Sequence, residues 1–230
     1  MITFFAAIGR YHLEVDRRGV TYPVIVTYGG KESIPDIQEM VIWSSLLWRI
    51  QTYDELKETY LREAEKMKIC SEASFDHYIN RLQQRGLIVE GKDIVGVDAV
   101  YNLLSRLYIV PITDSWLAKV AAFIKMTFEG TPLRVTCKIF RRTILSPDES
   151  MVIGIARQQL MSTAEIIRCL EKGVSKLHSE EELVDRLYDD EATTSDNIDI
   201  SSRSLRKKMP VVQAVANLYL KKQIIFEKAL

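Results

Sequence analysis

The chain has 230 residues, 47% of them hydrophobic and 27% charged, and its 31 basic residues equal its 31 acidic ones. This composition is typical of a globular protein with material for two domains of about a hundred residues each. Because the whole molecule has no net charge, binding of nucleic acid would depend on a local cluster of cations. No segment approaches the roughly 20 apolar residues that span a bilayer. The apolar start, Met1 to Ile8, lacks the flanks of a signal peptide, so we expect a cytoplasmic protein.

The residue types that carry catalysis or metal binding show no useful spacing. Three cysteines are far apart and odd in number, which indicates reduced thiols, and three histidines share no metal-ligand spacing with them: Cys70, Cys137, Cys169, His12, His77 and His178. The chain also has no glycine-rich phosphate loop and no nucleophile motif. We therefore expect no enzyme activity, no cofactor and no metal. The acidic runs and the three tryptophans are typical of solvated charge and of core or interface packing.

Alternating residues at the N-terminus predict a β-hairpin. Apolar and polar side chains alternate from Tyr11 to Val15 and again from Tyr22 to Tyr28, and a turn containing Gly19 separates the two runs. Gly29 and Gly30 then end the second strand.

Three helices and a second hairpin are expected next. The first helix opens at Pro35 and ends near Gln51, and Thr52 caps the second. The third begins at Ser71 and ends at Gly86. Its inward face consists of Phe75, Tyr78, Ile79 and Leu82. Residues 87–95 then form two short strands around the polar turn Glu90-Gly91-Lys92-Asp93.

The third helix and the strand after it contain the run Phe75-Asp76-His77-Tyr78-Ile79-Asn80-Arg81-Leu82-Gln83-Gln84-Arg85-Gly86-Leu87-Ile88-Val89. This run, together with the order of elements, resembles the winged-helix transcriptional regulators of the MarR-like type. The resemblance covers about 45 residues, from the second helix to Val95. It implies that the third helix enters the major groove of DNA and that the hairpin is the wing. The DNA contacts expected on this basis are Ser74, His77, Asn80, Arg81, Gln84, Arg85 and Lys92. The wing tip differs from that family, because it holds one cation and two anions.

A second copy of the unit is suggested by internal similarity. The segment from Met40 matches the one from Met151, and Thr52 then aligns with Thr163. Near the C-terminus, Asn80 aligns with Asn217, which leaves an insertion around residues 172–199 with a helix-like part from Glu180 to Tyr188. Chance recurrence of apolar triplets is the alternative. Residues 115–145 fit either helices or a further hairpin, with a helix favoured for Ser115 to Phe128.

The segment from Ser201 to Gln223 has six cations and no acid. They are candidates for phosphate contact, with a solubilising flank as the alternative: Arg203, Arg206, Lys207, Lys208, Lys221 and Lys222.

These observations together predict a mainly α (α+β) chain of tandem winged-helix units, divided into residues 1–110 and 111–230. The first functional hypothesis is a transcriptional regulator that binds double-stranded DNA. The alternative is a protein-interaction scaffold, which the zero net charge and the mixed-sign wing favour. A small-molecule sensor is a third option, and a homodimer stays open.

Overall fold

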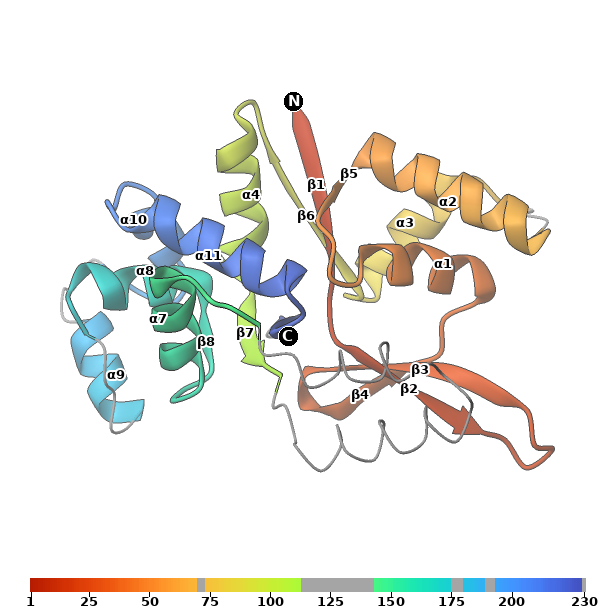
Figure 1. The fold of residues 1–230 in the computed structure, drawn as a ribbon, viewed down its shortest axis with the longest axis horizontal. Coiled ribbons are helices and arrows are strands. Elements are labelled where there is room, and N and C mark those ends of the chain that lie inside the picture. Colours follow the sequence, from red (N-terminus) through yellow and green to blue (C-terminus); the bar gives the residue numbers. More distant parts are fainter. Residues whose placement is uncertain (70–72, 113–142, 175–179, 189–192, 229–230) are drawn as a thin grey trace.

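The computed structural model describes residues 1–69, 73–112, 143–174, 180–188 and 193–228. It shows a mixed α/β protein in which helices pack around small three-stranded sheets (Figure 1). The question of helix or hairpin at residues 115–145 falls almost entirely outside the described residues.

The first half is built around a strand from the very N-terminus. Its elements are β1 (Ile2–Ala7), α1 (Ile37–Leu46), β5 (Gln51–Thr52), α2 (Tyr53–Met67), α3 (Phe75–Gln84) and β6 (Ile88–Asp93). β1 lies in the middle of an antiparallel sheet with the order β5-β1-β6. Thr52 caps α2 and Gly86 follows α3 with a φ of 71°, as the sequence predicts. The four inward residues of α3 are buried.

Three helix boundaries differ from the prediction. α1 begins after Asp36, whose side chain accepts a hydrogen bond from the backbone N–H of Glu39, so Pro35 lies outside the helix. α1 also ends before Trp48, which has a φ of 59°. α3 is capped by Ser74 and not by Ser71. At the two N-termini a polar side chain with the right geometry, Asp36 or Ser74, takes the capping position, whereas α1 ends at its C-cap Leu47, just before the turn at Trp48.

The predicted hairpin at residues 87–95 is wrong. β6 is one continuous strand, and its antiparallel partner is β1. Gly91 is not a turn residue: a Cβ atom there would lie 2.3 Å from the backbone nitrogen of Leu103. That residue belongs to α4 (Gly96–Leu104), which follows β6 and packs closely against it. The missing side chain therefore allows a helix to approach the strand.

The predicted N-terminal hairpin is confirmed. β2 (Arg10–Val15) and β3 (Thr21–Thr27) pair in the expected antiparallel register, and Gly19 in the turn has a φ of 79°. After a short 3₁₀ turn, β4 (Lys31–Ser33) adds a third strand to this sheet. The hairpin extends away from the rest of the chain (Figure 1).

The second half repeats the element order of the first. Its elements are β7 (Tyr108–Pro111), α7 (Pro147–Ala156), β8 (Met161–Ser162), α8 (Thr163–Glu171), α9 (Glu180–Leu187), α10 (Ile198–Ser202), α11 (Lys208–Leu220) and β9 (Ile224–Glu227). The sheet order β8-β7-β9 corresponds to β5-β1-β6. Thr52 caps α2, and Ser162 caps the equivalent helix α8. The predicted alignment of Thr52 with Thr163 is therefore shifted by one residue from these caps. α9 lies within the predicted insertion, around residues 172–199, and α10 begins at its end.

The two halves pack against each other. One apolar cluster belongs to the first half, and a second joins the second half to α4 and to Ala6 and Ile8. The hydroxyl of Tyr219 donates a hydrogen bond to the carbonyl of Leu46 at 2.9 Å. The backbone N–H of Gly9 donates to the carbonyl of Phe226, also at 2.9 Å. β7, at the end of the predicted first domain, is the central strand of the second sheet.

Candidate interaction surface

The outward side of α3 presents three exposed polar side chains, His77, Asn80 and Gln84. They stand three or four residues apart, so they share one helix face. Ser74 has a local task at the start of the helix, since its hydroxyl accepts a hydrogen bond from the backbone N–H of His77 at 3.3 Å. The structure therefore brings together three of the expected contact residues on a face that can form hydrogen bonds.

Both arginines of α3 are used inside the protein. Arg81 lies 2.9 Å from Asp36 and 3.3 Å from Glu39, and Arg85 lies 2.6 Å from Glu39. Arg85 also donates to the carbonyl of Ile34 at 2.9 Å. The side chain of Glu39 is fully buried, so it needs these cations to offset the loss of water. The two guanidinium groups thus attach the end of α3 to the start of α1.

An acid stands at the beginning of α3. Asp76 accepts a hydrogen bond from the hydroxyl of Tyr53 at 2.5 Å. This hydrogen bond, with burial and the nearby charge, raises the pKa of Tyr53 to about 12. A carboxylate in the first turn suits the helix dipole but repels a phosphate approaching the same end.

Lys92 does not lie at the tip of a hairpin. It is a residue of β6 opposite Thr3, and its ammonium group lies 2.6 Å from Glu90. The assignment of Lys92 to a wing tip is therefore wrong, because it depended on a turn at Gly91.

The basic segment of the second half is largely neutralised by acids from elsewhere. Arg203 pairs with Asp93 at 2.7 Å, and Lys208 pairs with Asp98 at 2.9 Å. Both of these acids belong to the first half.

Two further cations of this segment also have internal partners. Lys221 pairs with the buried Glu149 at 2.6 Å, and the ammonium group of Lys222 lies 4.9 Å from the ring centre of Trp48. Arg206 and Lys207 are exposed and have no ion pair among the described residues. Most cations of this segment therefore stabilise contacts within the protein.

The helix α11 is enclosed by the fold. Its apolar residues lie on several sides of the helix, and those buried are Val211, Val212, Ala214, Val215, Leu218 and Tyr219. It packs against α7 and α8 of its own half and against α4. A helix that is apolar around most of its circumference belongs to a core. It leaves little surface to enter a DNA groove.

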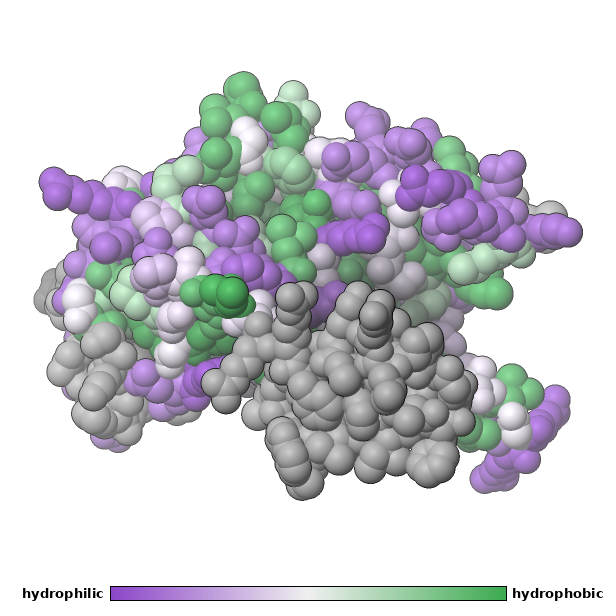
Figure 2. Space-filling model, in the orientation of Figure 1, coloured by the Kyte–Doolittle hydropathy of each residue, from purple (hydrophilic) through white to green (hydrophobic). Residues whose placement is uncertain are grey.

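An exposed apolar patch lies where β1 begins and β6 ends, and we call it the apolar tip. Its residues and their exposed fractions are Met1 86%, Ile2 39%, Ile94 82%, Val95 54% and Val97 40%. Ile2 and the turn at Gly96 are neighbours, because a Cβ atom on Gly96 would lie 3.8 Å from Ile2. Figure 2 shows hydrophobic colour over the end of α4 and next to the N-terminus.

The apolar tip has a signal in the sequence that the hairpin prediction obscured. Ile94 and Val95 lie between β6 and α4, and Val97 follows Gly96 in the first turn of α4. The predicted hairpin assigned Ile94 and Val95 to a strand, where they would have been partly buried. Since β6 ends at Asp93, they face solvent instead.

Comparisons of the chain with protein-family models, curated proteins and solved structures found no match. Within the described ranges, no three His, Cys, Asp or Glu side chains come together to hold a metal ion. The thiol of Cys169 is buried, and burial raises its pKa to about 12, which makes it a poor nucleophile. No helix in the part of the chain that the structure describes is long and apolar enough to cross a membrane.

Proposed function

We propose that the chain is a non-enzymatic protein-interaction scaffold made of two winged-helix units. Among the described residues, each half runs strand, helix, short strand, helix, helix, strand. The β2-β3-β4 sheet is inserted before α1 in the first half, and α9 and α10 are inserted before α11 in the second. A winged helix usually takes its third strand from a hairpin after the third helix. Here the corresponding strand precedes the first helix, as β1 in one half and as β7 in the other. The recurrence of this arrangement supports an origin by duplication.

The apolar tip is the observation that carries this proposal. It occupies the end of the β1 and β6 pair, which corresponds to a wing. The wings of the DNA-binding proteins that the sequence resembles usually carry Arg or Lys. Here the exposed side chains are apolar, and contiguous apolar patches of this kind mark surfaces that bind other proteins. The pairing of Arg81, Arg85 and Arg203 with internal acids points the same way.

Photo-crosslinking from position 94 tests the proposal. A photoreactive residue in place of Ile94 is expected to give a protein adduct in cells that produce the chain, and the second change Val97→Asp is expected to abolish it. The same photoreactive residue at position 206, exposed on the second half, is the control. The purified protein is expected to pass through a heparin column at low salt. Retention on heparin, together with nucleic-acid adducts from position 94, would contradict a protein partner.

DNA binding is the second candidate function, and one observation favours it. His77, Asn80 and Gln84 are exposed on the same face of the helix that reads DNA in winged-helix regulators. If that face reads bases, N80A with Q84A weakens a gel shift on genomic DNA, while R206A with K207A reduces its salt dependence. Arg203 and Lys208 are poor choices for this test, because each pairs with an acid of the first half.

A further inference from the structure

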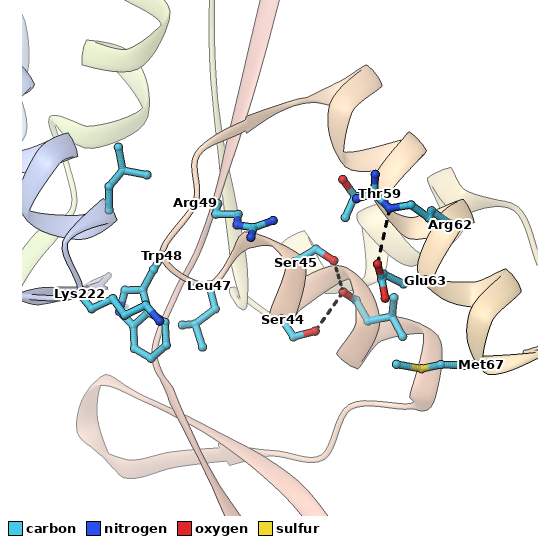
Figure 3. A pocket seen from close by; sticks show the side chains of 12 residues that line it. Ser44, Ser45, Leu47, Trp48, Arg49, Thr59, Arg62, Glu63, Met67 and Lys222 are labelled. Atoms are coloured by element: carbon cyan, nitrogen blue, oxygen red, sulfur yellow. Dashed lines mark hydrogen bonds and ion pairs between the residues drawn. The ribbon is translucent and has the colours of Figure 1, made fainter. Parts of the chain in front are cut away.

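A cavity of about 570 Å³ opens where the two halves meet. Its walls come from the C-terminal end of α1, from α2 and from the turn after α11, and Figure 3 shows these three groups of side chains around an open centre. The cations that line it are Arg49, Arg62 and Lys222. A cavity of this size is in the range that holds a small organic ligand.

The lining of the cavity is positively charged. Arg49 is exposed and has no carboxylate partner among the described residues, and the same is true of Lys222. Arg62 has a neighbouring acid, Glu63, at 3.6 Å, but Glu63 is held more closely by Lys66 at 2.8 Å. Three cations therefore face one acid that is already engaged.

Two lining residues adopt a backbone conformation that favours glycine. Trp48 and Lys222 both have a φ of 59°, and each follows the C-cap of a helix. At the matching position after α3 the chain has Gly86, with a φ of 71°. Large side chains in this conformation are strained, and such strain is often found at binding sites. Here the two side chains meet, with the ammonium group of Lys222 4.9 Å from the ring centre of Trp48.

The cavity also has an apolar part. Leu47, Trp48, Met67 and Leu220 line it beside the cations and hydroxyls. Guanidinium groups bind phosphate oxygens through paired hydrogen bonds. We propose that the cavity binds a phosphate monoester of an apolar or aromatic group. Arg49, Arg62 and Lys222 hold the phosphate, and the apolar residues surround the organic part.

Calorimetry with phenyl phosphate, performed on the whole chain, tests this proposal. We expect saturable binding of phenyl phosphate, and weaker binding of inorganic phosphate, of benzoate and of benzyl alcohol. Loss of one charged hydrogen-bonding group should weaken the affinity about tenfold or more, so R49Q and K222G are each expected to do so. R206Q removes an exposed arginine that does not line the cavity and should leave the affinity unchanged.

The variant K222G separates a binding role from a structural one. It removes the side chain but relieves the backbone, so the melting temperature should stay close to that of the unaltered protein while the affinity falls. If phenyl phosphate does not bind, or binds equally well to R49Q, K222G and R206Q, the proposal is overturned. Equal binding of benzoate would mean that a carboxylate is the true ligand. This measurement needs no partner protein, so its result is independent of the proposed function.

Discussion

The two halves share a framework but use the third helix differently. α3 buries one face, with Phe75 and Leu82 among its inward residues, and leaves His77 and Asn80 in solvent. α11 is apolar on several sides and lies between its own half and α4. The arrangement of apolar residues around the helix, more than the fold itself, therefore decides whether the helix presents a polar face to solvent or joins the two halves.

A buried carboxylate appears at the same place in both halves. Glu39 and Glu149 each complete a capping box at the start of a helix, and each lies 2.6 Å from the residue that caps the end of the third helix. That residue is Arg85 in the first half and Lys221 in the second. The first half adds a further cation, Arg81, at 3.3 Å from the carboxylate. The ion pair is thus reinforced in one half and single in the other.

The largest effect is expected from equivalent core truncations, one in each half. Leu82 and Leu218 each lie three residues before the C-cap of their helix, Arg85 in α3 and Lys221 in α11, and both are fully buried. Each change to alanine should lower the free energy of unfolding by about 2–5 kcal/mol, through lost burial and the cavity left behind. Because the halves pack together, both variants should shift one common transition, followed by circular dichroism during urea unfolding.

The control for this pair is Leu61→Ala, since Leu61 on α2 is 55% exposed. That change should alter the free energy of unfolding by less than about 0.5 kcal/mol. Two separate transitions, with L82A affecting one and L218A the other, would show that the halves unfold independently.

The next largest loss of stability is expected from breaking the single ion pair of Glu149, and a smaller loss from removing one of the two cations beside Glu39. Lys221→Met leaves the buried Glu149 without its cation, whereas Arg85→Met leaves Glu39 beside Arg81. Breaking a buried pair costs about 3–5 kcal/mol. The side chain of Lys221 is 35% exposed, so we expect about 2–3 kcal/mol for K221M and about 1 kcal/mol for R85M after discounting for solvent screening.

The pH dependence of stability adds a second test of K221M. Burial alone would raise the pKa of Glu149, but hydrogen bonds from Lys221 and from the backbone of Ser146 outweigh it and hold the pKa below its ordinary value of 4.5. In the unaltered protein this group therefore stabilises the fold above that value, and the contribution is lost as the pH falls below it. Without Lys221 burial prevails and the pKa rises, so the deficit of K221M should shrink between pH 7 and pH 5. Chemical denaturation at both pH values would measure this, and an unchanged deficit would contradict the assigned role of Lys221.

Local signals made much of the fold predictable. Thr52 caps a helix three residues before Glu55, Gly86 ends one, and alternation marks the hairpin around Gly19; each depends on residues close together in the chain. The pairing of β1 with β6 joins residues at opposite ends of the first half, and nothing local specifies it. The prediction of a turn at Gly91 failed for a similar reason. A glycine in this position can mark either a turn or the close approach of another element, and here it allows α4 to approach β6.

The candidate site was less predictable than the fold. The exposed face of α3 followed from helical spacing, but Arg203 and Lys208 each find an acid 110 positions away. A basic segment in the sequence therefore did not become a basic surface. The cavity near Trp48 also could not be seen, since it is formed by residues from both halves.

The smallest effect is expected at Gly86 and Lys222, the residues that follow the C-caps of α3 and α11. Gly86→Ala places a Cβ atom at a φ of 71° with open space around it, so backbone strain alone should cost about 1 kcal/mol. Lys222→Gly relieves a similar strain but loses the contact with Trp48, which is worth about 0.5–1 kcal/mol. The net change for K222G should therefore stay within about 0.5 kcal/mol, as measured by urea unfolding. A loss above that limit would mean that Lys222 stabilises the junction of the two halves; a change within it leaves the side chain available for binding in the cavity.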